Sequence, residues 1–171
     1  MDLYLVRHAV AYERDPDHWS DDSERPLTPE GEENFREASR GLEQVTPKVM
    51  ALLSSPYARA WRTAEILSEL EGWPEPKYFP ALEPDVPPEK TALALLDYSE
   101  AESVVLVGHR PGLHELAVYL LTGEAGSADI KIKKGAAVRI TFDGSPEPGA
   151  GKLHWIIPPK VLRSLRQTTL T

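Results

Sequence analysis

Three short apolar runs stand out along the chain, at Leu3 to Val6, Val49 to Leu53 and Val104 to Val107. None alternates with polar residues, a pattern typical of strands covered on both faces in a parallel sheet. Between them, apolar residues recur at three- and four-residue steps, which predicts helices. The sets are Phe35, Ala38, Leu42 and Val45; Ala60, Ala64, Leu67 and Leu70; and Leu113, Leu116, Ala117 and Leu120. This alternation predicts an α/β fold, a three-layer α/β/α sandwich with a mostly parallel central sheet.

Capping residues and prolines indicate where the helices begin. Thr28-Pro29-Glu30 offers a cap, a proline at the first helical position and an acid near the positive helix end. Ser55-Pro56 predicts a similar start for the second helix. The other expected elements are a weaker helix near Lys90 to Tyr98, a hairpin of Ala136 to Phe142 with Lys152 to Ile157, a terminal helix after Pro158-Pro159, and a mobile surface loop at Asp15 to Glu24. The length fits one domain over residues 1–171.

Composition excludes several classes of function. The chain has no cysteine, which rules out a disulfide framework, a zinc-thiolate site and a thiolate nucleophile. Nineteen basic against 27 acidic residues give a net charge of −8, so binding to nucleic acid or an anionic membrane is not expected. We expect a cytoplasmic protein, because the first apolar run is too short for a signal peptide and no later run approaches a membrane span.

Candidate chemistry follows each apolar run. Arg7-His8 follows the first, Ser54-Ser55-Pro56 with Arg59 follows the second, and Gly108-His109 follows the third. Sites in open parallel sheets form beyond the carboxyl ends of the strands. Each feature alone has an ordinary structural explanation, but three strand ends together bring two histidines and two arginines to one edge of the sheet.

These residue types suit phosphoryl transfer. Arginine can grip two phosphate oxygens and stays charged. A neutral imidazole can attack phosphorus and form a phosphoimidazole that water hydrolyses, and a second, protonated imidazole can stabilise charge on the phosphoryl oxygens. We expect one nitrogen of His8 to be tied to a backbone carbonyl, leaving the other free for attack. The scheme needs no cofactor and no metal, and the histidines lack the spacing of a chelating pair.

With these motifs the chain resembles the histidine phosphatase superfamily, which includes the phosphoglycerate mutases. The matching segments are Leu5 to His8, Arg25 to Gly31, Ser54 to Ala60 with Thr63-Ala64, and Val107 to His109. Membership implies a phosphoglycerate mutase-like fold and His8 as the phosphorylated nucleophile. It also implies a phosphate pocket of Arg7, Arg59 and His109. The family's usual glycine after the histidine is Ala9 here.

The chain departs from the family pattern most informatively at the general acid. Larger members of the family carry a glutamate or aspartate in a distinct sequence pattern, and that pattern is not found here. Glu83 is a candidate acid, and Arg25 a candidate substrate-binding residue. Small size without an evident acid resembles the SixA-type phosphohistidine phosphatases. An imidazole leaving group, with a conjugate acid of pKa about 6.5, needs less protonation than an alkoxide, whose conjugate acid has a pKa of about 15.

The sequence therefore predicts a phosphatase acting on phosphohistidine in a partner protein. The alternatives are a phosphatase for a small phosphorylated metabolite and, from a different class, a non-catalytic phosphate-binding regulatory module. The leaving-group argument fails if Glu83 or Asp85 reaches the pocket.

Overall fold

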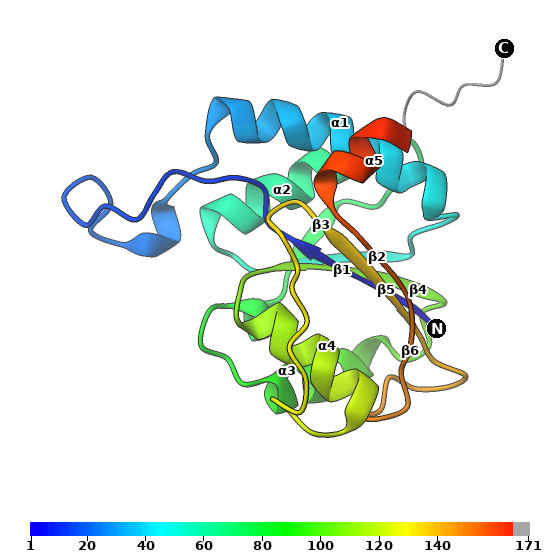
Figure 1. The fold of residues 1–171 in the computed structure, drawn as a ribbon. Helices are drawn as coiled ribbons and strands as arrows, with labels where there is room; N and C mark the ends of the chain where they lie inside the picture. Colours follow the sequence, from blue (N-terminus) through cyan, green and yellow to red (C-terminus); the bar gives the residue numbers. More distant parts are fainter. Residues whose placement is uncertain (166–171) are drawn as a thin grey trace, which may run out of the picture.

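The computed structural model describes residues 1–165 as one six-stranded sheet between two layers of helices (Figure 1). The strands are β1 (Asp2–Arg7), β2 (Ala51–Ser54), β3 (Pro76–Tyr78), β4 (Ser103–Gly108), β5 (Ala137–Thr141) and β6 (Lys152–Ile157). Their order is β3-β2-β4-β1-β5-β6. The first four strands run parallel, and β5 and β6 join the sheet antiparallel. The predicted α/β/α sandwich with a mostly parallel sheet is confirmed.

The five α-helices divide between the two faces of the sheet. They are α1 (Pro29–Val45), α2 (Ala58–Ser68), α3 (Pro88–Leu95), α4 (Gly112–Thr122) and α5 (Pro159–Leu165). Helices α1, α2 and α5 cover one face, where Phe35, Ala60 and Leu162 pack on the sheet. Helices α3 and α4 cover the other through Leu95 and Leu116. Because both faces are covered, the apolar residues within β1, β2 and β4 are buried, as their lack of alternation predicts, whereas Met50 of the second run lies before β2 and is exposed.

The helix starts differ in one informative way from the prediction. Thr28 caps α1 as expected, because its hydroxyl accepts a hydrogen bond from the N–H of Gly31 at 2.9 Å. The expected cap at Ser55 is wrong: α2 begins at Ala58, and its N-cap residue Tyr57 makes no side-chain cap. The hydroxyl of Ser55 instead bonds the ring of His109.

Short elements account for the remaining differences. Strand β3 was not predicted, because it is three residues long, lies at the sheet edge and is largely exposed. The expected helix near Lys90 to Tyr98 is α3 followed by a 3₁₀ turn, η3 (Leu96–Tyr98), and a similar turn, η2 (Pro80–Leu82), follows β3. The acidic segment Asp15 to Glu24 holds a third turn, η1 (Asp22–Glu24). Figure 1 shows this part of the chain extending beside α2.

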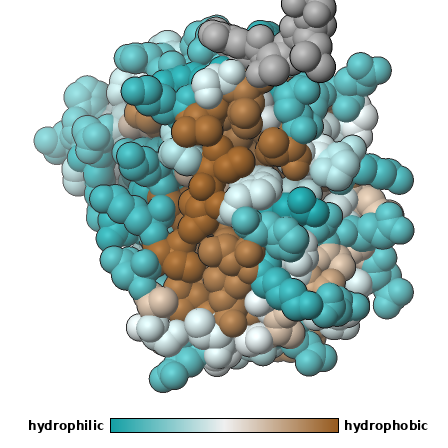
Figure 2. All heavy atoms as spheres, turned by 45° about the vertical axis from the view of Figure 1, so that its right-hand side comes forward, coloured by the Kyte–Doolittle hydropathy of each residue, from teal (hydrophilic) through white to brown (hydrophobic). Residues whose placement is uncertain are grey.

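The side of the molecule with β6 and α5 carries a band of hydrophobic side chains (Figure 2). Exposed apolar residues of these elements are Leu153, Ile156 and Val161. We assign this band no part in the site described below. No helix within residues 1–165 is long and apolar enough to cross a membrane. The expectation of a single domain over 1–171 stays a prediction, since residues 166–171 lie outside the described part.

Candidate active site

The carboxyl ends of β1, β2 and β4 are level with one another. Arg7 pairs in register with Gly108, and Ser54 with Val107. The residues that follow these strands therefore meet at one edge of the sheet. The imidazole rings of His8 and His109 have centroids 5.2 Å apart, and the guanidinium of Arg59 lies 5.1 Å from the ring of Tyr57, which is itself 5.3 Å from His109.

The ring of His8 is fixed by its own backbone neighbourhood. Its Nδ1 lies 2.7 Å from the carbonyl oxygen of Ala9. Because a carbonyl can only accept a hydrogen bond, Nδ1 carries the hydrogen, and the neutral ring has its lone pair on Nε2. The main chain of His8 is held at both ends, by Gly108 O accepting from its N–H at 3.0 Å and by the N–H of Gly135 donating to its carbonyl at 3.1 Å. The expected tie to a backbone carbonyl is present, and it leaves Nε2 available for attack.

Burial and positive charge keep this ring neutral. Burial lowers the pKa of His8 to about 3, and the charges of Arg59, Arg7 and Lys134 act in the same direction, while the bond to Ala9 opposes them. An imidazole neutral at physiological pH keeps the lone pair that a nucleophile needs. Lys134 was not singled out from the sequence, where it forms part of an ordinary basic cluster.

His109 is also buried, and its partner is Ser55. The distance from its Nε2 to the Ser55 hydroxyl oxygen is 2.8 Å, and that oxygen also accepts the N–H of Tyr57 at 3.3 Å. The Ser55 hydroxyl can donate its hydrogen to Nε2, and in that arrangement the ring hydrogen lies on Nδ1. Burial lowers the pKa of His109 to about 2, and the charges of Arg59 and Arg25 act in the same direction. Without a bound anion the ring is therefore neutral, and the expected protonated imidazole beside a bound phosphoryl group stays a prediction.

The two arginines each have part of the guanidinium anchored and part free. Arg7 donates from NH1 to the carbonyl of Ile132 at 2.9 Å, and the ring Nε2 of His114 lies 3.2 Å from the same oxygen. Arg59 donates from NH1 to the carbonyl of Asp22 at 2.7 Å, and its NH2 lies 3.0 Å from the Asp22 carboxylate. In both side chains Nε is buried and has no hydrogen-bond partner.

Unpartnered buried polar atoms gather at this edge of the sheet. Residues 1–165 contain five such side-chain atoms, and three of them belong to Arg7 (Nε), Arg59 (Nε) and His109 (Nδ1). A buried donor without an acceptor is costly, so each one needs an explanation. An oxyanion bound at this edge of the sheet could accept hydrogen bonds from such donors. The unpartnered atoms therefore support an anion site here.

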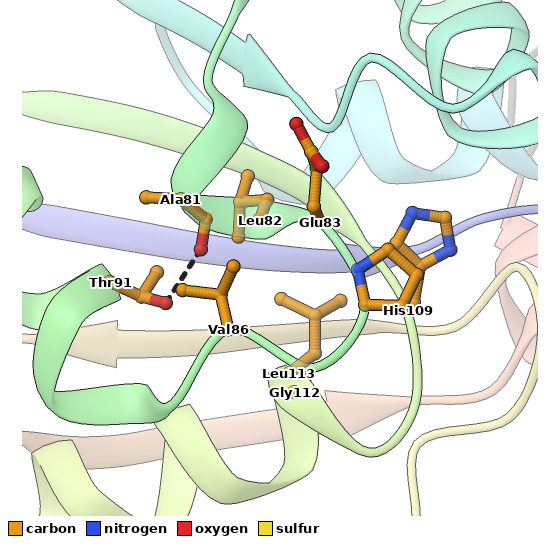
Figure 3. Close-up of a pocket in the computed structure, with 9 residues that line it drawn as sticks. Ala81, Leu82, Glu83, Val86, Thr91, His109, Gly112 and Leu113 are labelled. Carbon is orange, nitrogen blue, oxygen red and sulfur yellow. Dashed lines mark hydrogen bonds between the residues drawn. The ribbon is translucent and has the colours of Figure 1, made fainter. Parts of the chain in front are cut away.

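The two weaker candidates also lie near this group. Arg25 acts by its charge on the pKa values of His109 and Arg59, but its own Nε donates to the Asp22 carboxylate at 2.8 Å. Glu83 lines a pocket together with His109 (Figure 3), and its charge raises the pKa of Tyr57 after burial does. The leaving-group argument required that no carboxylate reach the pocket. The pocket that Glu83 lines includes His109 but not His8, Arg7 or Arg59, so the absence of an acid at the phosphate site stays a prediction.

Four residues around the site were missed as site residues. Asp22 contacts Arg59 and Ser55 contacts His109, as described above, while Tyr57 lies under the guanidinium of Arg59 and meets the ring of His109 edge-to-face. The Thr63 hydroxyl accepts the N–H of Ala9 at 3.0 Å and donates to the carbonyl of Arg59 at 2.7 Å, joining the end of β1 to α2. Two features of the sequence could have indicated two of these residues: Asp22 lies three residues before Arg25, and Ser55 lies at the end of a strand.

The described residues contain no group of three or more histidine, cysteine, aspartate or glutamate side chains placed to hold a metal ion. The metal-independent scheme stays a prediction.

Comparison with known proteins gives related molecules over most of the chain. An uncharacterized protein of Picosynechococcus sp. (strain ATCC 27264 / PCC 7002 / PR-6) is 36% identical over 141 residues, which are 81% of this chain and 83% of that protein. The structure of the protein histidine phosphatase SixA complexed with tungstate matches with a TM-score of 0.81 and 25% identity, covering 95% of this chain and 99% of that one. An α-ribazole phosphatase from Shigella flexneri shares the fold, with a TM-score of 0.69 and 16% identity over 93% of this chain and 97% of that one.

The sequence pattern of the histidine phosphatase superfamily (branch 1) matches residues 3–83, which include Arg7, His8 and Arg59. The fold match to the SixA structure covers 95% of the chain and so extends well beyond the residues of that sequence pattern. The chain therefore belongs to the histidine phosphatase superfamily, in its SixA-type branch, and is a phosphohydrolase.

Proposed function

We propose that this phosphohydrolase works in two displacements through a phosphohistidine on His8. In the first, Nε2 of His8 attacks phosphorus, the Nε2–P bond forms and the bond from phosphorus to the leaving group breaks. In the second, water attacks the same phosphorus, the Nε2–P bond breaks, and inorganic phosphate leaves with His8 restored. The observation that carries the proposal is the His8 ring, held neutral with Nδ1 bonded to Ala9 and Nε2 free.

The unpartnered donors supply the electrostatic part. The Nε–H groups of Arg7 and Arg59 are buried and lack an acceptor, and we assign the hydrogen of the neutral His109 ring to Nδ1, which also lacks a partner. Charge-assisted bonds of this kind are stronger than neutral ones, and in a buried site they act without reorganising water. We assign the three residues to the phosphoryl oxygens in both displacements.

We propose phosphohistidine in a partner protein as the preferred substrate. The support is the likeness to the protein histidine phosphatase SixA, which reaches 25% identity over nearly the whole of both chains. Because an imidazole leaves with less help than an alkoxide, this substrate does not require an acid at the site. The cytoplasmic location stays a prediction.

Glu83 favours a second candidate, a phosphatase for a small phosphate monoester. It lines a pocket together with His109, a residue that we assign to the phosphoryl oxygens, which makes its carboxyl group a candidate acid for the leaving group. An alkoxide benefits from such an acid, because its conjugate acid has a pKa of about 15.

The test compares a phosphohistidine protein with a chromogenic phosphate monoester for the wild type and His8→Ala. His154→Ala is a matched control, because His154 is exposed on β6 and its ring contacts only the hydroxyl of Thr141 among the described partners. The proposal requires turnover by the wild type and the control, and its loss in His8→Ala. No turnover of either substrate with retained phosphate binding would indicate a binding module instead.

A second variant separates the two substrates. Glu83→Gln removes the acid and keeps the shape of the side chain. If Glu83 protonates an ester leaving group, ester hydrolysis falls by about 100-fold while phosphohistidine hydrolysis changes little. Equal, small effects on both substrates would remove Glu83 from the mechanism. Hydrolysis of the ester alone by the wild type would overturn the phosphohistidine assignment.

A further inference from the structure

Asp22 holds two arginines at once. It lies on the turn η1, in the segment between β1 and α1. Its carbonyl accepts from NH1 of Arg59 at 2.7 Å, and Oδ2 of its carboxylate lies 3.0 Å from NH2 of the same side chain. Its Oδ1 accepts from Nε of Arg25 at 2.8 Å. A segment that the sequence pattern predicts to be a mobile surface loop thus reaches the candidate phosphate site.

These contacts select one edge of the Arg59 fork. A guanidinium has five N–H donors in a fixed plane. Asp22 contacts both terminal nitrogens, through a hydrogen bond from NH1 to its carbonyl and an ion pair between NH2 and its carboxylate. Neither contact involves Nε–H, which is buried without a partner and lies on the same side of the guanidinium as one N–H of NH2. These two point in the same direction and form a side edge that can bind a phosphate through two parallel hydrogen bonds.

The charges around Asp22 explain how a carboxylate can lie so close to an anion site. Burial opposes ionisation of Asp22, but the hydrogen bond from Arg25 and the charge of Arg59 outweigh it, so the pKa of Asp22 is lowered. The carboxylate is therefore ionised at neutral pH. One negative charge among two positive ones leaves this group of three side chains with a net positive charge.

We propose that Asp22 is a positioning residue for phosphoryl transfer: it fixes the end of the Arg59 guanidinium so that the Nε edge faces the phosphate, and it holds Arg25 beside that edge. This inference rests on the proposed function of the same site. The opposite role is competition, in which the Asp22 carboxylate keeps phosphate off Arg59. The free Nε edge favours positioning, because a competitor would have to occupy the donors that phosphate uses.

The two roles predict opposite signs when Asp22 is changed. Positioning predicts that Asp22→Ala lowers kcat/KM by about 10- to 100-fold, mostly through kcat, because a displaced catalytic group is costly at the transition state. Asp22→Asn should lose less, because the amide oxygen can still accept from Arg59. Competition predicts that both variants raise the affinity for substrate and for tungstate.

Asp21→Asn is the matched control. It removes the same charge one residue away, and Asp21 contacts the N–H of Ser23, a bond that an asparagine oxygen can replace. The control should stay within about twofold of the wild type, and the unfolding temperatures of all three variants should agree closely. An equal loss in Asp21→Asn and Asp22→Asn would overturn the inference, because it would reflect local charge rather than the contact with Arg59.

A double variant tests whether Asp22 acts through Arg59. In an Arg59→Ala background, Asp22→Ala should have almost no further effect on kcat/KM, since residues that act as a unit are not additive. A full additional loss would contradict the proposal.

Tungstate affinity, measured by calorimetry, separates this inference from the proposed function. If the wild type hydrolyses neither substrate, the proposed function fails. The inference still stands in that case if Asp22→Ala weakens tungstate binding while Asp21→Asn does not. Unchanged or tighter binding in Asp22→Ala overturns it.

Discussion

Lowering the pH from 7 to 5 should destabilise the folded protein through two buried histidines. The pKa values of His8 and His109 are lowered to about 3 and about 2 by burial and neighbouring cations. In the unfolded chain both rings have the ordinary pKa of about 6.5. The unfolded state therefore binds more protons than the folded state below about pH 6.5, and stability is lost as the pH falls from there toward the folded values.

The size of the effect follows from the distance between the test pH and the unfolded pKa. At pH 5 the unfolded ring is about 1.5 units below its pKa, and each unit is worth about 1.4 kcal/mol, so each histidine costs about 2 kcal/mol. Two such rings cost about 4 kcal/mol, a large fraction of the stability of a small domain. In His8→Asn, one of these rings no longer titrates, so the loss between pH 7 and 5 should be about 2 kcal/mol smaller than in the wild type.

Urea unfolding in phosphate-free buffers at pH 5, 6 and 7 measures this difference. Phosphate is omitted because an anion that binds the folded state would itself add stability. The carboxylates contribute to the slope in both proteins, so the difference between wild type and His8→Asn isolates the histidine. The control His154→Asn removes an exposed ring, which lies outside the site. Equal pH dependence in wild type and His8→Asn would refute the assignment of a neutral, buried His8.

Three further variants test the packing and the phosphate pocket. Ser55→Ala removes the hydroxyl that contacts Nε2 of His109, so steady-state kinetics should show kcat/KM lower by about 10-fold, and urea unfolding should show a loss of about 1 to 3 kcal/mol, because buried polar groups lose their partner. Arg7→Ala should weaken tungstate binding in calorimetry by about 10- to 100-fold, the value of a lost charge-assisted bond, whereas Lys160→Ala, an exposed cation on α5, should not change it. Gly41→Ala places a Cβ 1.8 Å from the carbonyl oxygen of Leu162, so urea unfolding should show a loss of about 2 to 3 kcal/mol as α1 and α5 separate; an unchanged midpoint would contradict their close packing.

The fold could be predicted because its strands are buried on both faces. A run such as Val104 to Val107 is typical of a strand covered on both faces, and the helical spacing between the runs completes the α/β alternation. Strand β3 was not predictable in this way, because Pro76, Lys77 and Tyr78 lie at an edge and bury little apolar surface. Its pairing with β2 is decided by tertiary contact rather than by pattern.

The convergence of the site could also be predicted, because parallel strands place their carboxyl ends at one edge. The protonation states of the histidines in the site could not be predicted from the sequence. His109 was expected to be charged, but whether a ring is charged depends on its burial and on Arg59, neither of which a motif reveals. The same holds for Asp22, whose position 37 residues before Arg59 in the sequence gives no indication that the two side chains pair.

The account depends most directly on the atom of His8 that receives the phosphoryl group. Rapid mixing with substrate, an alkaline quench that preserves phosphohistidine, and ³¹P and ¹H NMR of the denatured protein would identify that atom. We expect an acid-labile phosphate on Nε2 of His8 in the wild type and none in His8→Ala, because Nδ1 is bonded to the carbonyl of Ala9. Phosphate on Nδ1, on another residue, or on no residue during active turnover would contradict it.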